Sequence, residues 1–586
     1  MRKRNRRLFD TALCVVVMIA LSVPGVFAQT SLSADKASYR PPVTARKYIV
    51  ESNHPLASMA GLKILESGGN AVDAAVAVAS ALSVVEPACS NIFGGDAFIM
   101  IYSAKDKKVY VVNASGWAPT GATPDYYLAK GEMPSAGIDS FEIPGAFSGW
   151  MQALDRFGTK KPKELFKPAI DLCEKGVTVT PFYNFMIEYS VPILNEEARA
   201  IFMENGKAKQ VGSVVYQPNL AKTFRDIGKA GSAAKAEKKF YKVYGKKLAE
   251  FSKGLGGLHT EADFADFRAE IVDPLKTNFQ GLDVYACPPG CQGMALIEAL
   301  NILEKYDIKA LGHNTPEYIN LVTEAFNLAF ADRDKYCGDP RFVDIPIEGL
   351  TSKAYADKLR ERIKQGSVNL KVVGGALKPE QYQETSGLKH ENTTFFSVVD
   401  EEGNVVSCTT SIMGFFGSGL VAGDTGILLN DRMVYFWLDA DHPNVVAPRK
   451  RTFQTITPSI ALKDGKPLVV FGTPGSDVQE QTKLQILFNL VYFGMNPQQA
   501  VEAPRFRTLA FPAASYPHAA YEGLLSIESR VPEDVFKALS DMGYKVKKYP
   551  EWTIGVGGAG MIYIDPKTGS LIGGVDPRRE GYVLGW

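Results

Sequence analysis

Two strand-rich regions separated by a long helical region constrain the fold of this chain most strongly. The first holds two apolar runs, residues 98–102 and 109–112, which predict a pair of buried strands. The second begins near residue 390, where residues 394–400 and 405–410 flank a Glu-Glu-Gly-Asn turn and predict a hairpin. Further strands are predicted at residues 427–429, 459–462, 468–471 and 561–564, with a final strand near Leu571.

Helical patterns fill the remainder of the chain. Residues 68–82 form a run of small residues in which Asn70 suits the N-terminal end of a helix, and the many alanines allow tight packing in a core. Other helices are predicted at residues 162–174, 220–227, 234–251, 315–334 and 480–492. Strand-rich regions with helices outside them predict an α+β fold of layered sheets and helices.

Residues 1–28 have the three parts of an export signal. A basic stretch at residues 2–7 precedes an apolar run at residues 12–21, and Val26-Phe27-Ala28 provides a cleavage site that ends in a small residue. An uncleaved membrane anchor is the alternative, but a bilayer span needs about 20 apolar residues. We therefore predict cleavage after Ala28, no stable membrane span, and a periplasmic or secreted protein.

Charge and cysteine content exclude several classes of protein. The formal charge is +1, and removing residues 1–28 takes away five basic residues and Asp10, which leaves −3. A nucleic-acid partner is not expected, because such binders carry a basic excess. Six scattered cysteines remain, and most are predicted to be buried free thiols; Cys287 and Cys291 are close enough in sequence to pair, and this stays open. The isolated histidines predict no metal site, and no cofactor is expected.

A series of short motifs runs through almost the whole chain after the signal. They are Gly68-Gly-Asn-Ala-Val-Asp-Ala-Ala75, Val85-Glu-Pro87, Pro288-Pro-Gly290 with Gly293, Ala329-Phe-Ala-Asp-Arg-Asp334, Thr393-Thr394, Gly417-Ser-Gly419, Gly426-Ile-Leu-Leu-Asn430, Lys450-Arg451, Gly472-Thr-Pro-Gly475, Ala503-Pro-Arg-Phe506 and Asp576-Pro-Arg578. Each is weak alone, but in this order and spacing the series resembles the gamma-glutamyltranspeptidases, a branch of the N-terminal-nucleophile hydrolases.

The resemblance implies a four-layer αββα sandwich and self-cleavage of the bond between Asn392 and Thr393. The products would be a large subunit, residues 29–392, and a small subunit, residues 393–586. The two subunits would share one core as a heterodimer.

The resemblance also assigns catalytic roles. Thr393 would be the nucleophile, and its freed α-amino group, with a pKa near 8, would be the base. Thr394 and Ser411 are candidate supporting hydroxyls, and the backbone N–H groups of Gly475 and Ser476 match the family's oxyanion hole. Without the resemblance, residues 390–400 predict only a strand, and the glycine turn after residue 471 predicts only a turn.

Substrate-binding positions depart from the family pattern. Ser115 stands where the family has an arginine for the substrate α-carboxylate, and Tyr435 stands where it has an aspartate for the α-amino group. Gln454 and Thr455 replace a pair of serines. Because buried charges without partners cost several kcal/mol, these changes argue against a γ-glutamyl zwitterion as substrate.

The changed positions predict a more apolar pocket. Tyr435, Met413 and Trp117 would line it, and whether Arg432 or Lys450 supplies the missing positive charge is left open.

Three functions are compatible with these observations. The first is an exported hydrolase or acyltransferase that acts on γ-glutamyl amides such as glutathione. The second is an amidohydrolase of the same chemistry with another acyl group, such as glutaryl or oxamate-like amides. The third is a non-catalytic binding protein that kept the fold. In the first two, the partner is a small-molecule amide.

Overall fold

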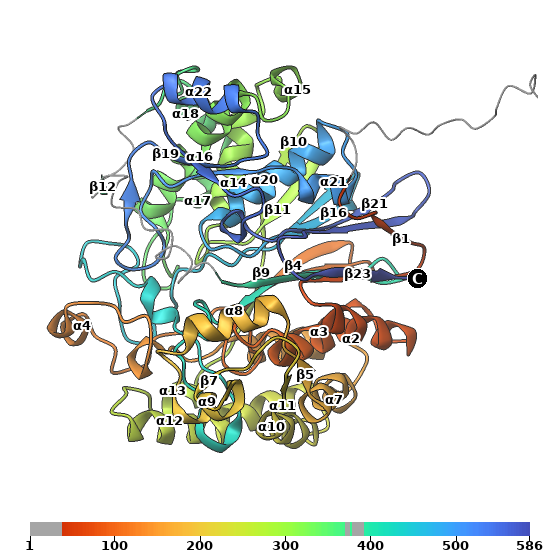
Figure 1. The fold of residues 1–586 in the computed structure, drawn as a ribbon, viewed down its shortest axis with the longest axis vertical. Helices are drawn as coiled ribbons and strands as arrows, with labels where there is room; N and C mark the ends of the chain where they lie inside the picture. Colours follow the sequence, from red (N-terminus) through yellow and green to blue (C-terminus); the bar gives the residue numbers. More distant parts are fainter. Residues whose placement is uncertain (1–37, 370–375, 378–391) are drawn as a thin grey trace, which may run out of the picture. The chain divides into compact units, whose positions relative to one another are not determined.

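Two antiparallel sheets of seven strands each form the centre of the protein (Figure 1). The structure is a computed structural model that describes residues 38–369, 376–377 and 392–586. The predicted signal, residues 1–28, lies outside the described residues. Residues Tyr39–Trp586 form one body. Among the described residues, no helix is both long enough and apolar enough to cross a membrane.

The first sheet joins segments from both predicted subunits. Its order is β1 (Val43–Ala45), β22 (Leu571–Val575), β21 (Gly560–Ile564), β16 (Lys466–Gly472), β15 (Ser459–Lys463), β11 (Leu282–Ala286) and β10 (Leu275–Phe279).

The second sheet also joins segments from both predicted subunits. Its order is β23 (Tyr582–Gly585), β2 (Ile49–Ser52), β13 (Thr394–Val399), β14 (Val405–Ser411), β3 (Asp96–Ser103), β4 (Lys108–Ala114) and β9 (Glu270–Val272). Phe98 and Met100 of this sheet pack against Val470 and Ile562 of the first, so the two sheets bury an apolar layer between them.

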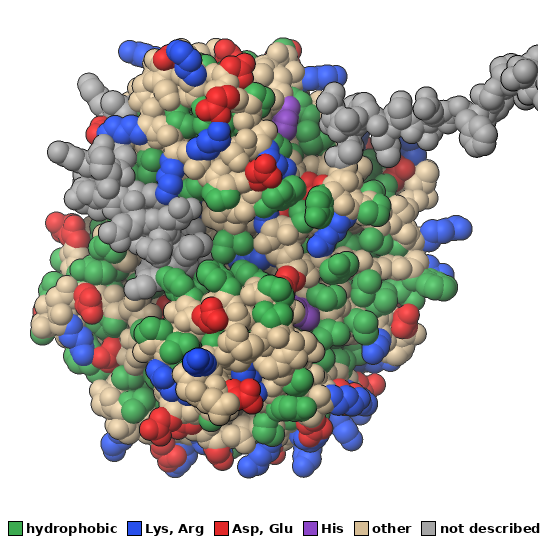
Figure 2. Space-filling view, viewed as in Figure 1, with side chains coloured by type: hydrophobic (Ala, Val, Ile, Leu, Met, Phe, Trp, Pro, Cys, Tyr) green, Lys and Arg blue, Asp and Glu red, His purple; other side chains and the backbone are tan. Residues whose placement is uncertain are grey.

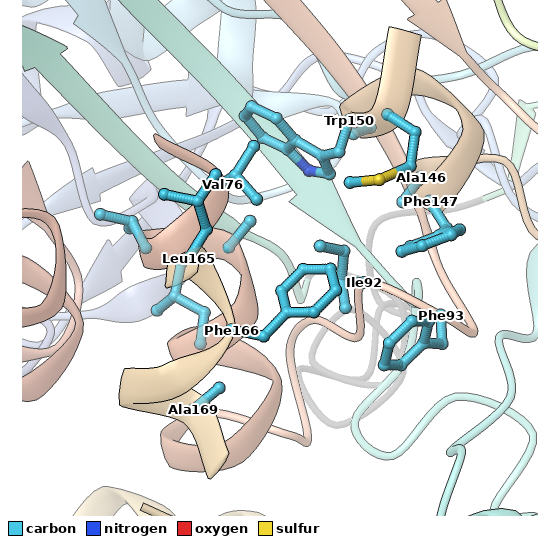
Figure 3. Close-up of a cluster of buried hydrophobic side chains, with 14 of the residues drawn as sticks. Val76, Ile92, Phe93, Ala146, Phe147, Trp150, Leu165, Phe166 and Ala169 are labelled. Carbon is cyan, nitrogen blue, oxygen red and sulfur yellow. The ribbon is translucent and has the colours of Figure 1, made fainter. Parts of the chain in front are cut away.

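Helices cover the outer face of the second sheet. They include α2 (Pro55–Glu66), α3 (Ala71–Val85), α5 (Ala146–Phe157), α6 (Pro162–Leu165), α7 (Lys167–Lys175) and α10 (Pro218–Gly228). Every residue of α3 is buried, and the Asn70 side chain caps its first turn. Figure 3 shows Val76 of α3 in the same buried cluster as Ile92, Phe147 and Leu165. Trp150 of α5 stacks on Phe396 of β13 with ring centroids 5.8 Å apart, which fixes the helical layer to the sheet.

A second helical layer covers the outer face of the first sheet. It includes α14 (Gly293–Leu303), α16 (Pro316–Tyr336), α18 (Lys353–Arg360), α20 (Val478–Val491), α21 (Pro497–Glu502) and α22 (Glu533–Asp541). Leu296, Phe326 and Leu487 of these helices share one buried cluster with Val469 of β16. The order helix, sheet, sheet, helix confirms the predicted four-layer αββα sandwich.

Smaller elements complete the fold. They are α4 (Pro124–Lys130), β5 (Val177–Thr178), α8 (Pro181–Ser190), α9 (Glu196–Phe202), β6 (Met203–Glu204), β7 (Lys207–Ala208), β8 (Val214–Val215), α11 (Ala233–Lys239), a π-helical turn (Phe240–Tyr244), α12 (Gly245–Gly254), α13 (Glu261–Ala265), α15 (Ile308–Leu311), α17 (Ile347–Leu350), β12 (Ala376–Leu377), β17 (Phe506–Thr508), β18 (Ala520–Tyr521), β19 (Leu524–Glu528) and β20 (Lys545–Tyr549).

Most predicted elements are confirmed, and three predictions are wrong in detail. Residues 427–429 form no strand, only an isolated bridge between Val421 and Leu428, because the chain turns at Gly426 with a φ of +69°. Residues 162–174 form two helices that meet at Phe166, where Pro168 begins a new first turn. The strand near Leu571 is followed by another, β23, which pairs with β2.

The hairpin β10–β11 was not predicted, although its turn has a recognisable signature. Gln280 and Gly281 connect the strands with φ values of +51° and +82°. Positive φ at both turn residues is typical of the tight hairpin turns in which glycine is favoured.

The surface and the cysteines agree with the composition. Figure 2 shows basic and acidic side chains interspersed on the viewed face, as expected for a near-zero net charge. The six cysteines after the signal are buried free thiols, including Cys287 and Cys291.

Candidate active site

Thr393 lies at the start of the central hairpin of the second sheet. It directly precedes β13, which pairs with β14 so that Thr394 is opposite Thr410. Ser411, the next residue of β14, therefore lies beside the Asn392–Thr393 peptide bond. The strong strand formers on both sides of the Glu-Glu-Gly-Asn turn set this register.

The hydroxyl of Thr393 contacts the carbonyl group that precedes it. Its Oγ1 is within hydrogen-bond distance of the Asn392 carbonyl oxygen and 3.2 Å from Ser411 Oγ. The Ser411 hydroxyl lies 3.1 Å from the same carbonyl oxygen and accepts a bond of 2.9 Å from the Met413 N–H. The Asn392 side-chain amide nitrogen donates to the Ala88 carbonyl at 2.5 Å, which holds the residue that precedes the bond.

Thr394 is not part of this cluster. Its buried side chain lies beside the Glu86 carboxyl group. Burial raises the pKa of Glu86 to about 7, and the nearby Arg579 guanidinium opposes that shift. Arg579 Nη1 lies 4.0 Å from Glu86 Oε1. The structure therefore separates the two predicted supporting hydroxyls: Ser411 contacts Thr393, and Thr394 faces a buried carboxyl group.

Gly475 and Ser476 form a tight turn between β16 and α20. Their φ values are +124° and +50°. A Cβ at Gly475 would lie 2.4 Å from Val478 Cγ1, so the turn requires glycine there. Gln292 Nε2 donates to the Ser476 carbonyl at 3.0 Å and to the Thr455 carbonyl at 3.1 Å. The turn lies at the N-terminus of α20, where the helix dipole favours developing negative charge.

Tyr435 and Thr455 lie together beside this turn. The Tyr435 hydroxyl and Thr455 Oγ1 are 2.8 Å apart. Met413 packs in the same apolar cluster as Tyr435, as predicted. Trp117 does not line it, because its indole nitrogen donates to the Asp263 carbonyl at 3.2 Å in a different cluster.

Ser115 and Gln454 belong to a buried charged cluster rather than an apolar pocket. Gln454 Nε2 donates to Ser115 Oγ at 3.0 Å and to Asp96 Oδ2 at 3.1 Å, and it lies 3.5 Å from Glu142 Oε1. The Gln454 amide oxygen accepts from Arg432 Nη1. Arg432 Nε lies 3.7 Å from Asp96 Oδ2, and both side chains are fully buried.

The two candidate cations have different surroundings. Arg432 points into the cluster beside Ser115. Lys450 does not, because its ammonium group donates to the Pro443 carbonyl at 2.7 Å and to the Val445 carbonyl at 3.0 Å.

Asp96 and Glu142 also belong to this buried cluster, and the sequence analysis did not name them. Asp96 interrupts an otherwise apolar stretch at the start of β3, and a charge there is a signal that could have been used. Burial and the neighbouring Asp96 carboxylate raise the pKa of Glu142 well above its ordinary value. Nothing local in the sequence places Glu142 beside Asp96.

Comparisons with known proteins agree on one family. The family described as Gamma-glutamyltranspeptidase matches residues 57–586. The glutathione hydrolase proenzyme of Bacillus subtilis is 33% identical over 100% of this chain and 99% of its own length. The acylase ACY 1 proenzyme of a Pseudomonas species (strain V22) is 34% identical over 94% of this chain and 95% of its own length.

A solved structure shows the same fold. The crystal structure of cephalosporin acylase from Bacillus halodurans superposes with a TM-score of 0.83 at 32% identity, covering 95% of this chain and 98% of that one. Because the family match, the relatives and the αββα layers agree, the chain is an enzyme that belongs to the gamma-glutamyltranspeptidase family.

Proposed function

We propose that this protein is an exported, self-cleaving amidase and acyltransferase that uses Thr393 to hydrolyse or transfer γ-glutamyl-type amides such as glutathione. The observation that carries this proposal is the Thr393 hydroxyl held against the Asn392 carbonyl by Ser411. Relatives named as glutathione hydrolase proenzymes support it.

Self-cleavage uses only groups of the chain and water. The Thr393 oxygen attacks the Asn392 carbonyl carbon, the C–N bond breaks, and the departing nitrogen takes up a proton to become the Thr393 amine. Water then hydrolyses the Asn392 ester, which restores the hydroxyl and leaves a carboxylate on Asn392. The products are the subunits 29–392 and 393–586.

The freed amine then serves as the base for catalysis. An α-amino group with a pKa near 8 is about one-tenth unprotonated at pH 7. It accepts the Thr393 hydroxyl proton as the oxygen attacks the substrate amide. The N–H groups of Gly475 and Ser476 stabilise the oxyanion, and one such donor contributes about 3 kcal/mol. The amine part of the substrate leaves with the proton that the Thr393 α-amino group accepted. Water or a second amine then takes the acyl group from Thr393.

Amide hydrolysis with a different acyl group is the second candidate. Ser115 replaces the family's arginine, and one relative is named an acylase and one structural neighbour a cephalosporin acylase. Glutaryl and oxamate-like amides are the substrates that this alternative predicts.

Export is proposed from the sequence of residues 1–28. The basic residues and the apolar run that follows them predict removal of this segment and a periplasmic or secreted protein. Mass measurement of the mature large subunit tests this, because it should begin at Gln29.

The proposal is tested on purified protein by gel electrophoresis and N-terminal sequencing. Wild type should give two chains, the smaller beginning at Thr393, and Thr393→Ala should stay intact. Thr393→Ser is the matched control, because it keeps a hydroxyl nucleophile and should still cleave. Cleavage at this bond in Thr393→Ala would refute the assignment. An intact wild-type chain that turns over no amide would favour a non-catalytic binding protein.

A substrate panel then separates the two enzymatic candidates. Glutathione and γ-glutamyl-p-nitroanilide are compared with glutaryl and oxamate amides. Preferred turnover of the γ-glutamyl compounds supports the main proposal, and preferred turnover of glutaryl or oxamate amides supports the second.

A further inference from the structure

Basic side chains are concentrated in one helical segment of the chain. Residues 218–256 contain ten Lys and Arg residues and three acidic ones, so the segment has a formal charge of +7. The chain without residues 1–28 has a charge of −3, so all its other residues together carry −10. A negatively charged surface would therefore attract this segment and repel the rest of the protein.

The lysines follow the outer face of one long helix. α11, the π-helical turn and α12 continue into one another from Ala233 to Gly254, and α11 and α12 lie at the lower edge of Figure 1. One face is fixed inward, because Phe240, Tyr241 and Leu248 belong to the buried cluster beneath the second sheet. The opposite face carries exposed lysines at intervals of three, four, four and seven residues: Lys235, Lys238, Lys242, Lys246 and Lys253. This row is about 27 Å long, at 1.5 Å per residue.

Most of the exposed lysines have no acidic partner. Four bases of the segment do form ion pairs: Arg225 with Glu174, Lys239 with Asp226, Lys246 with Glu250 and Glu261, and Lys247 with Asp424. Six exposed lysines form no ion pair with any residue that the structure describes: Lys222, Lys229, Lys235, Lys238, Lys242 and Lys253. Their charge is not neutralised within the protein and is directed at solvent.

Two exposed apolar side chains lie among these lysines. Val243, next to Lys242, is 44% exposed, and Leu255, two residues after Lys253, is 52% exposed. A basic helical face that also presents apolar side chains is typical of helices that lie on the headgroup region of a bilayer. Because the other face of this helix is held in the core, only its outer side chains can enter that region.

The kind of basic residue indicates the kind of anion. Nine of the ten bases are lysines, and the single arginine, Arg225, is already paired with Glu174. Arginine is the residue that binds one carboxylate or phosphate through two parallel hydrogen bonds, whereas lysine is a flexible, strongly hydrated point charge. A row of unpaired lysines therefore suits a broad array of anionic headgroups better than a single anionic group on a peptide.

We propose that the outer face of residues 222–253 is a docking surface for a membrane that contains anionic phospholipids. The protein rests on the membrane through its lysines, with Val243 and Leu255 at the headgroups, and the negatively charged remainder faces away. The inference goes beyond the proposed amide chemistry and does not depend on it, because the face includes no residue of the Thr393 site.

Vesicle sedimentation of the self-cleaved wild-type protein tests the docking surface. Vesicles of phosphatidylcholine alone are compared with vesicles of equal parts phosphatidylcholine and phosphatidylglycerol. The protein should sediment only with the anionic vesicles, and its partition coefficient should fall at least about tenfold between about 0.1 M and about 0.5 M salt. Absence of binding to the anionic vesicles at the lower salt concentration would overturn the proposal, and so would equal binding to both kinds of vesicle.

A charge-neutralised variant locates the contact. Lys235→Gln, Lys238→Gln, Lys242→Gln and Lys253→Gln are combined, since glutamine keeps a similar helix propensity. Partitioning to the anionic vesicles should weaken about 100-fold, because each lysine near an anionic surface contributes to binding. The matched control makes the same change in net charge at four exposed lysines outside the segment, Lys105, Lys309, Lys466 and Lys567. The control should bind within about threefold of wild type.

The comparison of the two variants decides whether this face is the contact. Equal binding by wild type and the neutralised variant would overturn the assignment, and so would an equal loss in the control, which would show an effect of net charge alone. Tighter binding of soluble polyglutamate than of vesicles, at equal concentration of anionic groups, would indicate an acidic polymer instead and would also overturn it. Circular dichroism establishes that both variants are folded, and the lipid and salt dependence of wild type remains decisive if one is not. Vesicle binding without amide turnover would retain the docking surface and refute the proposed function, whereas turnover without vesicle binding would do the reverse.

Discussion

Ser411→Ala should slow self-cleavage strongly while the precursor still folds. The Ser411 hydroxyl contacts Thr393 Oγ1 at 3.2 Å, the Asn392 carbonyl oxygen at 3.1 Å and the Met413 N–H at 2.9 Å. Alanine removes all three contacts and leaves a buried N–H without its acceptor. Loss of a buried hydrogen-bonding partner costs about 1 to 3 kcal/mol. If that loss appears in the transition state for attack on Asn392, cleavage slows roughly five- to 150-fold.

The assay follows appearance of the two subunits on denaturing gels after the precursor is made by rapid expression or in vitro translation. Ser411→Thr is the matched control, because it keeps the hydroxyl and should cleave within a few-fold of wild type. Circular dichroism establishes that each precursor is folded. A folded Ser411→Ala precursor that cleaves at the wild-type rate would show that Ser411 does not orient Thr393 or the carbonyl group.

Two further perturbations address the oxyanion turn and the buried carboxyl group. Gly475→Ala should abolish turnover, because residue 475 has a φ of +124° and the new Cβ would lie 2.4 Å from Val478 Cγ1. Ser476→Gly should preserve turnover and raise the free energy of unfolding by about 1 kcal/mol, because residue 476 has a φ of +50°. An active Gly475→Ala enzyme would contradict the role of the turn. Burial raises the pKa of Glu86 from about 4.5 to about 7, so the folded chain holds a proton that the unfolded chain releases and stability should fall as pH rises from about 4.5 to 7. In the uncleaved Thr393→Ala background, urea unfolding should show that Glu86→Gln removes about 3 kcal/mol of this fall, and an unchanged pH dependence would refute it.

Local sequence signals were sufficient for the elements that hold the nucleophile. The β13–β14 hairpin combines strand-forming residues with a Gly-Asn turn, and both strands are fully buried in the centre of a sheet. The helix α3 combines an Asn70 cap with small residues throughout, so propensity and packing agree. Short strands such as β9 (Glu270–Val272) lack such agreement, because they form only where a neighbouring strand is already in place.

The buried charged cluster could not be derived from local signals. Asp96, Glu142, Arg432 and Gln454 come from four separate segments, and their proximity depends on how the second sheet packs against the loops around it. The sequence shows that the family's arginine is missing at Ser115. It does not show that a guanidinium group from another segment lies beside that position. The predicted apolar surroundings are therefore found for Tyr435 and Met413, whereas Trp117 lies in a different cluster.

The charged cluster and the candidate nucleophile are connected through one pair of strands. Asp96 is paired with Ser411 across β3 and β14, so a shift of register at this pair would move Asp96 and Ser411 together. Arg432, by contrast, lies on a short turn outside the sheet and reaches the cluster through its contact with Gln454. We therefore expect substitutions at Arg432 or Ser115 to alter the charged cluster while the contact between Thr393 and Ser411 stays in place, whereas substitutions on β13 and β14 should disturb that contact.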